Sequence, residues 1–494
     1  DLSCGRGGDV DRYIKSDNNI KFVLGLDIED INEASRRYFY KQANNKAVFL
    51  QYDTSKNIKS KEQPDINKHS KIMIDILYGT AKSVPVQYKQ IYNDYKKITK
   101  GKGGTGTFQV VSSQFTLHYY LRSEETFNGF LTNVEENITK ADMVFISVNT
   151  PTKTKGIGAG QASDLKWVEA CARQVAENAK GHTIVVEKST LPVKTAEVIK
   201  KILEDVQFSE NKQSEITFDV LSNPEFLAEG TAVKDLKEPD RVLIGGENKK
   251  AILALDQIYS NWVPKEKILH TNIWSSELAK LTSNAFLAQR ISSINSIGAL
   301  CEATGADVRE VARAIGTDSR IGSKFLDSGP GFGGSCFKKD ILNLVYLSKY
   351  FGLDAVAKFW EGVVNLNYWH KHRIPELIVK KLFGTVTGKI IIILGFAFKA
   401  NTNDTRESSA ISICKDLLEE GAILKIHDPK VTKTQIEKDL GMSEKTIPEK
   451  IDYQKRSYFE GSWSYCYEFI NSFEDADAVV VLTEWPEYAR IDWK

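Results

Sequence analysis

The sequence predicts an α/β protein built from doubly wound parallel sheets, and three observations lead to that prediction. Short apolar runs of strand length recur along the chain, at 143–148, 183–187 and 389–394. These runs end in polar stretches, and segments of helical pattern follow, as expected of parallel strands buried on both faces. A long amphipathic pattern at 276–301 divides the runs into two groups, so we expect two α/β domains joined by a long central helix.

The composition sets the class of protein. A chain of 494 residues is too long for one ordinary domain, so two to four are expected. Its 41% hydrophobic and 27% charged residues describe a soluble globular protein, and a net charge of +1 gives no argument for a nucleic-acid or membrane partner. The six cysteines lack the spacing of a zinc site, so we expect a cytoplasmic chain with reduced thiols and no metal. Because the chain begins at Asp1 without a signal peptide, we expect it to start inside a longer reading frame.

The most informative stretch is the glycine-rich segment 329–340, with the sequence GPGFGGSCFKKD. Its four glycines permit positive φ and close backbone approach, and they lead into Cys336, just before a predicted helix. A position near a helix N-terminus, beside Lys338 and Lys339, lowers the pKa of a thiol, and Asp340 lies one helical turn further on. A lone cysteine in a glycine turn is more often a buried packing residue. The glycines, lysines and aspartate together favour a nucleophile.

The segment 331–340 resembles the nucleophile loop of UDP-glucose 6-dehydrogenases, and the likeness runs from about Thr139 to Lys494. That family oxidises UDP-glucose to UDP-glucuronate with two NAD in succession, through a cysteine-bound thiohemiacetal and thioester. The resemblance implies that Cys336 is the nucleophile and that the domains are Rossmann-like. It also implies a homo-oligomer based on dimers that form through the helix at 276–301, with a hexamer as one alternative.

The same resemblance implies roles for other side chains. Lys280 and Asn284 lie at i and i+4 of one helix and would stabilise the oxyanion, while Asp340 and Glu225 would handle protons. The expected cofactor contacts are Thr150, Thr190, Glu229 and Arg406. The expected substrate contacts are Phe226, Leu227, Arg320, Phe332, Gly333, Phe398 and Lys399. Taken singly, such lysines and glutamates are more often solvated surface residues.

The first 136 residues follow a different pattern. A glycine turn formed by Gly5, Gly7 and Gly8 follows the end of a strand, and a second strand at 22–27 ends in Asp27. A carboxylate about 20 residues past such a turn binds a ribose hydroxyl, but this signal does not separate NAD from S-adenosylmethionine. Further strands are expected at 47–52 and 108–115.

The segments 1–9, 26–28 and 113–120 resemble messenger-RNA cap guanine-N7 methyltransferases. The resemblance implies S-adenosylmethionine contacts at Gly5, Arg6, Gly7 and Asp27. It also implies that His118 and Tyr119 face the cap guanine, although such a pair is more often packed under a loop.

We therefore expect four segments. They are a partial methyltransferase-like Rossmann segment at 1–136, an incomplete NAD-binding domain at 137–272, a central helical dimerisation region with the nucleophile loop at 273–383, and a UDP-sugar-binding domain, C-terminally truncated, at 384–494. The dehydrogenase family's own glycine turn is missing upstream of Lys140, so weakened NAD binding is expected. The favoured function is oxidation of UDP-glucose. The alternatives are RNA cap guanine-N7 methyl transfer and an inactive chimeric chain.

Overall fold

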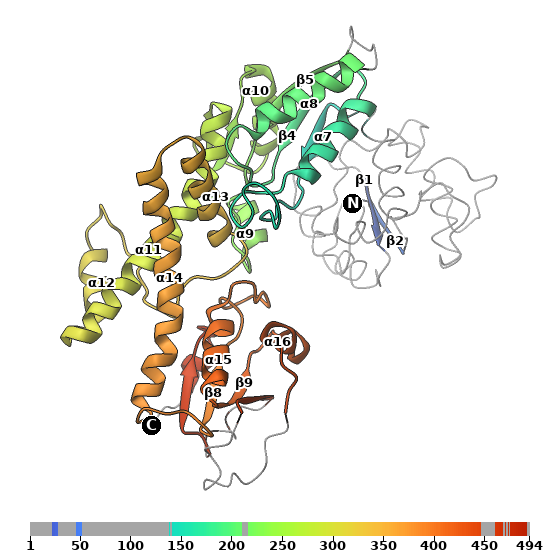
Figure 1. Cartoon of the computed structure of the whole chain (residues 1–494). Helices are drawn as coiled ribbons and strands as arrows, with labels where there is room; N and C mark the ends of the chain where they lie inside the picture. Colours follow the sequence, from blue (N-terminus) through green and yellow to red (C-terminus); the bar gives the residue numbers. More distant parts are fainter. Residues whose placement is uncertain are drawn as a thin grey trace. The chain divides into compact units, whose positions relative to one another are not determined.

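The computed structural model describes residues 141–209, 216–445, 460–467 and 475–491, the single residues 138, 470 and 473, and the backbone of two further strands. The chain divides into two compact units (Figure 1). Unit 1 comprises Asp1–Thr150, Leu165–Glu225 and Lys237–Glu277. Unit 2 comprises Pro151–Asp164, Phe226–Leu236 and Leu278–Lys494. Each unit is described by itself below.

Two strands near the start of unit 1 form a parallel pair. Strand β1 (Phe22–Asp27) lies beside β2 (Lys46–Gln51), and Asp27 is the last residue of its strand, as predicted. The other features expected in this segment lie outside the described residues. They are the glycine turn with Gly5 and Gly7, the strand at 108–115, and the pair His118 and Tyr119.

The main sheet of unit 1 has five strands in the order β3-β4-β5-β6-β7. Their bounds are Met143–Ile146, His182–Glu187, Thr217–Ser222, Val242–Gly245 and Ile268–Thr271. Strands β3, β4 and β5 are parallel, and β6 is parallel to β7. However, β6 meets β5 in the antiparallel sense, through the single pair Ser222 and Gly245. The predicted parallel order therefore holds within these two groups and fails where they join.

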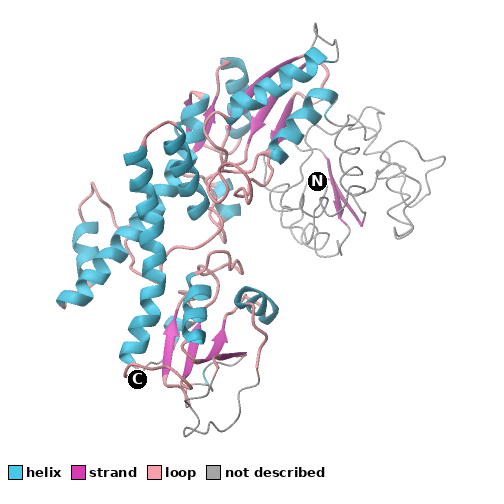
Figure 2. Ribbon diagram, viewed as in Figure 1, coloured by secondary structure: helices cyan, strands magenta, loops and turns pink. Residues whose placement is uncertain are grey.

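Both faces of this sheet are covered, as the predicted doubly wound architecture requires. Val185 of β4 packs in one core with helices α7 (Lys166–Asn178) and α8 (Thr195–Ser209). Its neighbour Val186 belongs to a different core, which includes residues of α10 (Lys249–Tyr259). Successive side chains of a strand point to opposite faces, so these two cores lie on opposite sides of the sheet. Figure 2 shows α7 and α8 beside each other over the strands.

Strand β3 ends two residues earlier than the apolar run predicts. The backbone N–H of Val148 donates to Ser189 Oγ over 2.8 Å, so a side chain takes the place of a partner strand. The apolar run therefore predicts the place of the strand correctly, but its last residues belong to the loop at the carboxyl end of the sheet.

Unit 2 begins with a group of helices, which includes most of α11. The bounds are Ile273–Thr304 for α11, Val308–Gly316 for α12, Phe337–Tyr350 for α13 and Asp354–Lys381 for α14. The long helix predicted at 276–301 is confirmed. Three small or apolar residues of its predicted stripe are fully buried against α13 and α14, namely Leu281, Ala285 and Ala288. Two others, Leu278 and Phe286, are 43% and 56% exposed, so the stripe is only partly used within this unit.

The sheet described in unit 2 has four parallel strands in the order β10-β9-β8-β11. Their bounds are Ser462–Tyr465, Ile423–His427, Ile390–Leu394 and Ala478–Val481. All five residues of β8 are buried, as its continuous apolar sequence predicts. Helices α15 (Ser409–Glu419) and α16 (Lys433–Leu440) complete this α/β layer (Figure 1).

The sequence pattern at 478–485 predicts a strand that reaches Trp485, but β11 ends at Val481. Thr483 Oγ1 donates to the carbonyl of Ala397 over 2.6 Å, and Trp485 Nε1 donates to Asp428 Oδ2 over 3.2 Å. The side chains of both residues therefore help to hold this segment in the core beyond the end of the strand. Within the described part of the chain, no helix is long and apolar enough to cross a membrane.

Candidate active site

The glycine-rich loop delivers Cys336 to the first position before helix α13. Cys336 is exposed, occupies the N-cap position, and has its Sγ 3.5 Å from Ser335 Oγ. Gly331 has φ of 112° and Gly334 has φ of 84°, in the region that favours glycine. A Cβ at Gly331 would lie 2.7 Å from Asn367 Oδ1, so there is no room for a side chain. The loop therefore depends on these glycines for its shape, as predicted.

Lys338 and Lys339, the two lysines after Cys336, both pair with carboxylates. Lys338 Nζ lies 3.0 Å from each carboxylate oxygen of Glu407, and Lys339 Nζ lies 3.3 Å from Asp340 Oδ1. An ammonium group that is paired with a carboxylate has much of its field cancelled at a third group. The positive charge of both lysines is therefore largely offset by these carboxylates, and their action on Cys336 stays a prediction. The partial positive charge at the start of α13 remains close to Cys336.

Helices α11 and α13 meet at a buried polar contact. Asn284 Nδ2 donates to Asp340 Oδ2 over 2.6 Å, and Asp340 is only 1% exposed. Lys280, one turn earlier on α11, is buried as well, and its Nζ lies 5.3 Å from the ring centre of Phe226. Leu227 follows Phe226 in the same segment of unit 2. Four predicted site residues therefore lie together where α11 and α13 approach each other, namely Asn284, Asp340, Lys280 and Phe226.

A second group of predicted residues surrounds Arg406. Its guanidinium binds Asp404 with contacts of 2.6 to 2.9 Å, and Nη2 also lies 3.3 Å from Glu229 Oε1. The hydrogen bond to Asp404 is the main cause that raises the pKa of Arg406, and Cys336 is among the groups that add to this effect. Burial, and then the charge of Asp404, raise the pKa of Glu229. The two predicted cofactor contacts in unit 2, Glu229 and Arg406, are thus in contact with each other.

The predicted substrate residues Gly333 and Phe398 pack directly together. A Cβ at Gly333 would lie 2.8 Å from Phe398 Cβ, and one at Gly334 would lie 3.0 Å from the phenyl ring. Lys399 Nζ is 5.6 Å from the centre of that ring. Phe332 is buried in the same loop, in edge-to-face contact with the ring of Phe337. Arg320, in contrast, is highly exposed and pairs with Asp318 over 2.6 Å.

In unit 1, two threonines meet at the carboxyl ends of adjacent strands. Thr150 Oγ1 donates to the carbonyl of Thr190 over 3.0 Å, just beyond β3 and β4. Open α/β sheets bind their ligands at this edge, and two hydroxyl groups there fit the polar end of a nicotinamide nucleotide. Glu225 follows β5 at the same end of the sheet and also belongs to unit 1. Its approach to Cys336 of unit 2 stays a prediction.

Asn223, two residues before Glu225, was not among the predicted site residues, and its side chain links three parts of unit 1. Its Nδ2 donates to Leu243 O over 2.8 Å. Its Oδ1 accepts from Tyr259 Oη over 2.6 Å and from Lys188 Nζ over 3.0 Å. An asparagine directly after a buried strand was the available signal, since buried amides need several partners.

Three residues of α14 were also not predicted; two of them bind the nucleophile loop, and the third binds Glu407, which pairs with Lys338 of that loop. Asn367 accepts from Phe332 N and donates to Phe332 O, and His370 Nε2 lies 2.8 Å from Gly329 O. Lys371 Nζ donates to Glu407 O over 2.9 Å. Asn367, His370 and Lys371 occupy positions i, i+3 and i+4, so they share one helix face. That spacing was the only sequence signal for them.

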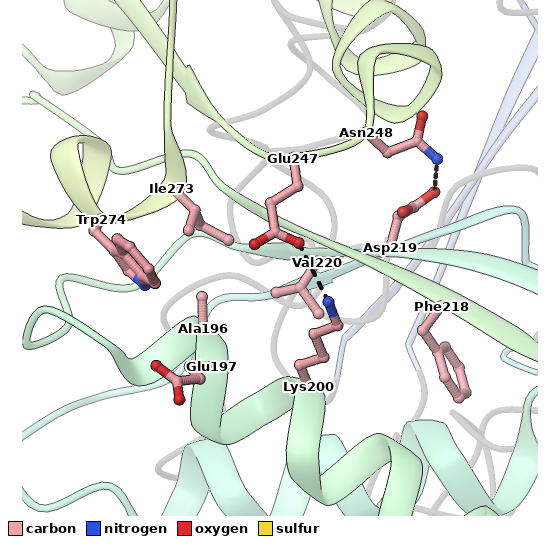
Figure 3. A pocket seen from close by; sticks show the side chains of 10 residues that line it. All are labelled: Ala196, Glu197, Lys200, Phe218, Asp219, Val220, Glu247, Asn248, Ile273 and Trp274. Carbon is pink, nitrogen blue, oxygen red and sulfur yellow. Dashed lines mark hydrogen bonds and ion pairs between the residues drawn. The ribbon is translucent and has the colours of Figure 1, made fainter.

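A pocket of about 180 Å³ lies in unit 1, and none of the predicted site residues lines it. Two polar pairs bridge its lining (Figure 3). Lys200 Nζ is 3.2 Å from Glu247 Oε2, and Asn248 Nδ2 donates to Asp219 Oδ2 over 2.7 Å. The pocket's polar groups are thus largely satisfied by one another, and it is not the candidate active site.

Models of two protein families match this chain, one over residues 96–494 and the other over residues 1–155. Three domain models of the UDP-glucose/GDP-mannose dehydrogenase family match in order. They are the NAD-binding domain at residues 96–263, the central domain at 274–369 and the UDP-binding domain at 392–494. The mRNA (guanine-N(7))-methyltransferase domain model matches residues 1–155.

Similar proteins agree with the dehydrogenase match. The chain is 55% identical over 372 residues to UDP-glucose 6-dehydrogenase of Gallus gallus, covering 74% of this chain and 72% of that protein. It is 52% identical over 370 residues to UDP-glucose 6-dehydrogenase 1 of Glycine max, covering 74% of this chain and 76% of that protein. A solved UDP-glucose dehydrogenase structure from Pyrobaculum islandicum aligns with a TM-score of 0.61 and 30% identity, over 81% of this chain and 84% of that one. The chain therefore belongs to the UDP-glucose 6-dehydrogenase family.

Proposed function

We propose that this chain oxidises UDP-glucose to UDP-glucuronate in two NAD-dependent steps, through a thioester on Cys336. The observation that carries the proposal is an exposed cysteine at the start of α13, one helical turn from the buried pair of Asp340 and Asn284. A helix N-terminus favours a thiolate, and a buried carboxylate one turn away can hold a proton. Family membership supports the choice of substrate and cofactor.

The covalent chemistry belongs to Cys336. Its thiolate adds to the C6 aldehyde carbon of the half-oxidised sugar and forms a thiohemiacetal, whose oxidation leaves a thioester. Water then cleaves the thioester, releasing the sugar carboxylate and the free thiol. NAD, when bound, supplies the hydride acceptor for both oxidations.

Lys280 and Asn284 stabilise the negative charge that develops on the C6 oxygen. Both side chains are buried on the same face of α11, where a hydrogen-bond donor is worth more than in water. Asp340 receives and returns protons, and its position is fixed by Asn284 and Lys339. Glu225 directs the water that hydrolyses the thioester.

The remaining predicted residues bind the two ligands. The UDP-sugar lies against the nucleophile loop, with contacts from Phe226, Leu227, Phe332, Gly333, Phe398 and Lys399, and with Arg320 of a neighbouring subunit. Thr150, Thr190, Glu229 and Arg406 bind the nicotinamide end of NAD. Their polar groups and their places at the sheet edge and beside the Cys336 loop support this assignment.

The test is turnover by the purified full chain. With UDP-glucose and NAD, we expect NADH and UDP-glucuronate in a ratio of about two to one, because an alcohol loses two hydrides on its way to an acid. Trapping with a single equivalent of NAD, followed by mass spectrometry of the Cys336 peptide, detects the bound sugar. Absence of NADH with any concentration of UDP-glucose contradicts the proposal.

A second candidate function, methyl transfer to an RNA cap, has its only support in the family match at residues 1–155. In that function Gly5, Gly7 and Asp27 bind S-adenosylmethionine, and His118 and Tyr119 face the guanine. It accounts for the first part of the chain alone, since the dehydrogenase domain matches extend to residue 494. Calorimetric titration with NAD and with S-adenosylmethionine separates the two. A micromolar dissociation constant for S-adenosylmethionine, with no heat of binding on addition of NAD, favours the methyltransferase function.

We also propose that two copies of the chain associate through α11. Leu278, Phe286 and Leu300 are exposed on this helix although all three are large and apolar. Apolar side chains in one row favour burial against a second copy. Sedimentation of the wild-type chain and of Phe286→Asp tests this, with a dimer or larger assembly expected for the wild type and a smaller species for the variant. Identical sedimentation of both proteins argues against an interface at α11.

A further inference from the structure

Glu407 has an unusual backbone conformation for its residue type. Its φ is 54°, in the left-handed region that side chains other than glycine rarely adopt. Such a conformation persists only where the surrounding contacts impose it, and it often marks a place where geometry serves function. Glu407 directly follows Arg406, and the backbone N–H of Arg406 donates to Asp404 Oδ1. The segment 404–407, named here the Arg406 turn, is therefore a constrained element beside the candidate active site.

The Arg406 turn forms hydrogen bonds with the nucleophile loop on both sides of Cys336. Two residues before the cysteine, Gly334 N donates to the carbonyl of Arg406 over 2.8 Å. Two residues after it, Lys338 Nζ binds both carboxylate oxygens of Glu407 at 3.0 Å. The turn also lies close against the loop itself, because a Cβ on Gly333 would be 2.7 Å from Glu407 O. A shift of this turn would therefore displace Cys336 from both directions.

Lys371 holds the Arg406 turn from the other side. Its Nζ donates to the carbonyl of Glu407 over 2.9 Å, and the side chain is only 6% exposed. The charged groups that act on it are the attractive carboxylate of Glu407 and the repulsive ammonium of Lys338. Burial lowers the pKa of Lys371 to about 8. Since the unfolded pKa is higher, keeping this ammonium charged at pH 7 costs folding stability. A buried cation kept at such a cost points to a use other than stability.

We propose that Lys371 and Glu407 are positioning residues for the nucleophile, with Lys371 fixing the strained Arg406 turn and that turn fixing Cys336 through Gly334 and Lys338. The proposal rests on the function proposed above for Cys336. It adds two residues that act on Cys336 through other groups, Lys371 through the backbone of Glu407 and Glu407 through Lys338. The same turn presents the Arg406 guanidinium, so one element sets the place of both the thiol and a cofactor contact.

The decisive variants are Lys371→Met and Lys371→Arg in the full chain. Methionine removes the donor to Glu407 O and the buried charge, while arginine keeps both. For Lys371→Met we expect kcat to fall about tenfold or more with KM for UDP-glucose changed less than about twofold, because a misplaced reactive group affects the chemical step. The melting temperature should stay level or rise, since the cost of the buried ammonium is removed. Lys371→Arg should restore at least half of kcat.

A second measurement is independent of turnover. The rate at which iodoacetamide alkylates Cys336 is followed by mass spectrometry of its peptide at pH 7. We expect it to fall about threefold or more in Lys371→Met and in Glu407→Gln, because the thiol leaves its place at the helix N-terminus. Lys349→Met is the matched control, since Lys349 forms a 3.2 Å pair with Glu361 at the far end of α13. Its alkylation rate should equal that of the wild type.

The outcomes separate this inference from the function on which it rests. If the wild type shows no turnover, the dehydrogenase function fails and the alkylation rates still decide the positioning role. Alkylation of Cys336 at an unchanged or faster rate in both Lys371→Met and Glu407→Gln overturns the inference. A loss of kcat that accompanies a large fall in melting temperature, and that arginine does not restore, also overturns it in favour of a purely structural role.

Discussion

Asn284 of α11 and Asp340 of α13 are joined by a 2.6 Å hydrogen bond in a site from which solvent is almost excluded. The carboxylate has few other ways to be solvated, so the amide of Asn284 helps both to bring the helices together and to keep Asp340 in place. A side chain with this position can serve stability and catalysis at once. The two contributions can be separated by measuring unfolding and turnover in the same variants.

Asn284→Ala should destabilise unit 2 by about 1.5–3 kcal/mol, the usual cost of removing a hydrogen bond to a buried charged group. Chemical denaturation followed by circular dichroism measures this loss. Gln289→Ala is the matched control, because Gln289 lies on the same helix and donates to Ser293 in a less buried place. Its expected loss is below about 1 kcal/mol. Equal losses in the two variants would show that Asp340 does not depend on Asn284.

Cys336→Ser should reduce kcat about a thousandfold or more while UDP-glucose binding stays nearly intact. A hydroxyl is a much weaker nucleophile than a thiolate, but it is similar in size and leaves the loop geometry unchanged. NADH formation and calorimetry with UDP-glucose measure the two quantities. Cys171→Ser, in α7 of unit 1, is the control and should retain activity. UDP-glucuronate formation by the Cys336 variant would exclude a thioester on this residue.

Two buried glutamates make unit 1 sensitive to pH. Glu187 and Glu277 are 1% and 2% exposed, and Glu277 accepts from the backbone N–H groups of Lys194 and Ala196. Burial, and then the charge of Glu277, raise the pKa of Glu187 well above its ordinary value, and burial also raises the pKa of Glu277. A carboxyl with a raised folded pKa contributes stability below its unfolded pKa, near 4.3, and loses it as pH rises through the folded pKa.

We therefore expect the free energy of unfolding of the wild type to fall between pH 5 and pH 8, by about 1.4 kcal/mol for each unit by which folding raises a pKa, and the urea midpoint to fall with it. Glu187→Gln, which resembles the protonated form, should show a smaller fall. Glu197→Gln is the control, because Glu197 is exposed and pairs with Lys201. A Glu187→Gln variant whose midpoint follows the wild type across this range would show that the pair does not titrate there.

The sequence predicted those parts of the fold that depend on local pattern. Strands β4 and β8 were expected within a residue or two of their observed bounds, because a continuous apolar run has few uses other than a buried parallel strand. The antiparallel orientation of β6 relative to β5 depends on how the chain returns to the sheet, and the periodicity of apolar residues does not predict strand direction. Trp485 looked like a strand residue because an apolar run does not show which side chain will bind Asp428.

The site was predicted where a motif carries it in consecutive residues, as in the loop around Cys336. The contacts of α14 with that loop join residues 35 to 41 positions apart in the sequence, so no local sequence pattern predicts them. The pairing of Lys338 with Glu407 joins residues 69 positions apart, so the sequence shows the lysine beside Cys336 but not the carboxylate that offsets its charge. Long-range ion pairs of this kind are the main reason why charges read from a sequence mislead.

Arg406→Met tests the assignment of Arg406 to the cofactor. The guanidinium is held by Asp404 and Glu229, so it is already oriented before a ligand arrives. One charge-assisted hydrogen bond contributes about 1.5–3 kcal/mol, so its loss should raise KM for NAD about tenfold to a hundredfold. KM for UDP-glucose should change much less. Steady-state kinetics with each substrate varied in turn measures both constants.

The control for this prediction is Arg173→Met, which removes an arginine that binds Glu169 in a similar way on the exposed face of α7. It should leave both KM values unchanged.

Arg406→Met also leaves Asp404 and Glu229 without their cation, and their mutual repulsion should then raise the pKa of Glu229 further. The loss of NAD affinity should accordingly be larger at pH 8 than at pH 6, because the two carboxylates repel an anionic cofactor most when both are ionised. A rise in KM for UDP-glucose alone would place Arg406 at the sugar nucleotide and not at NAD.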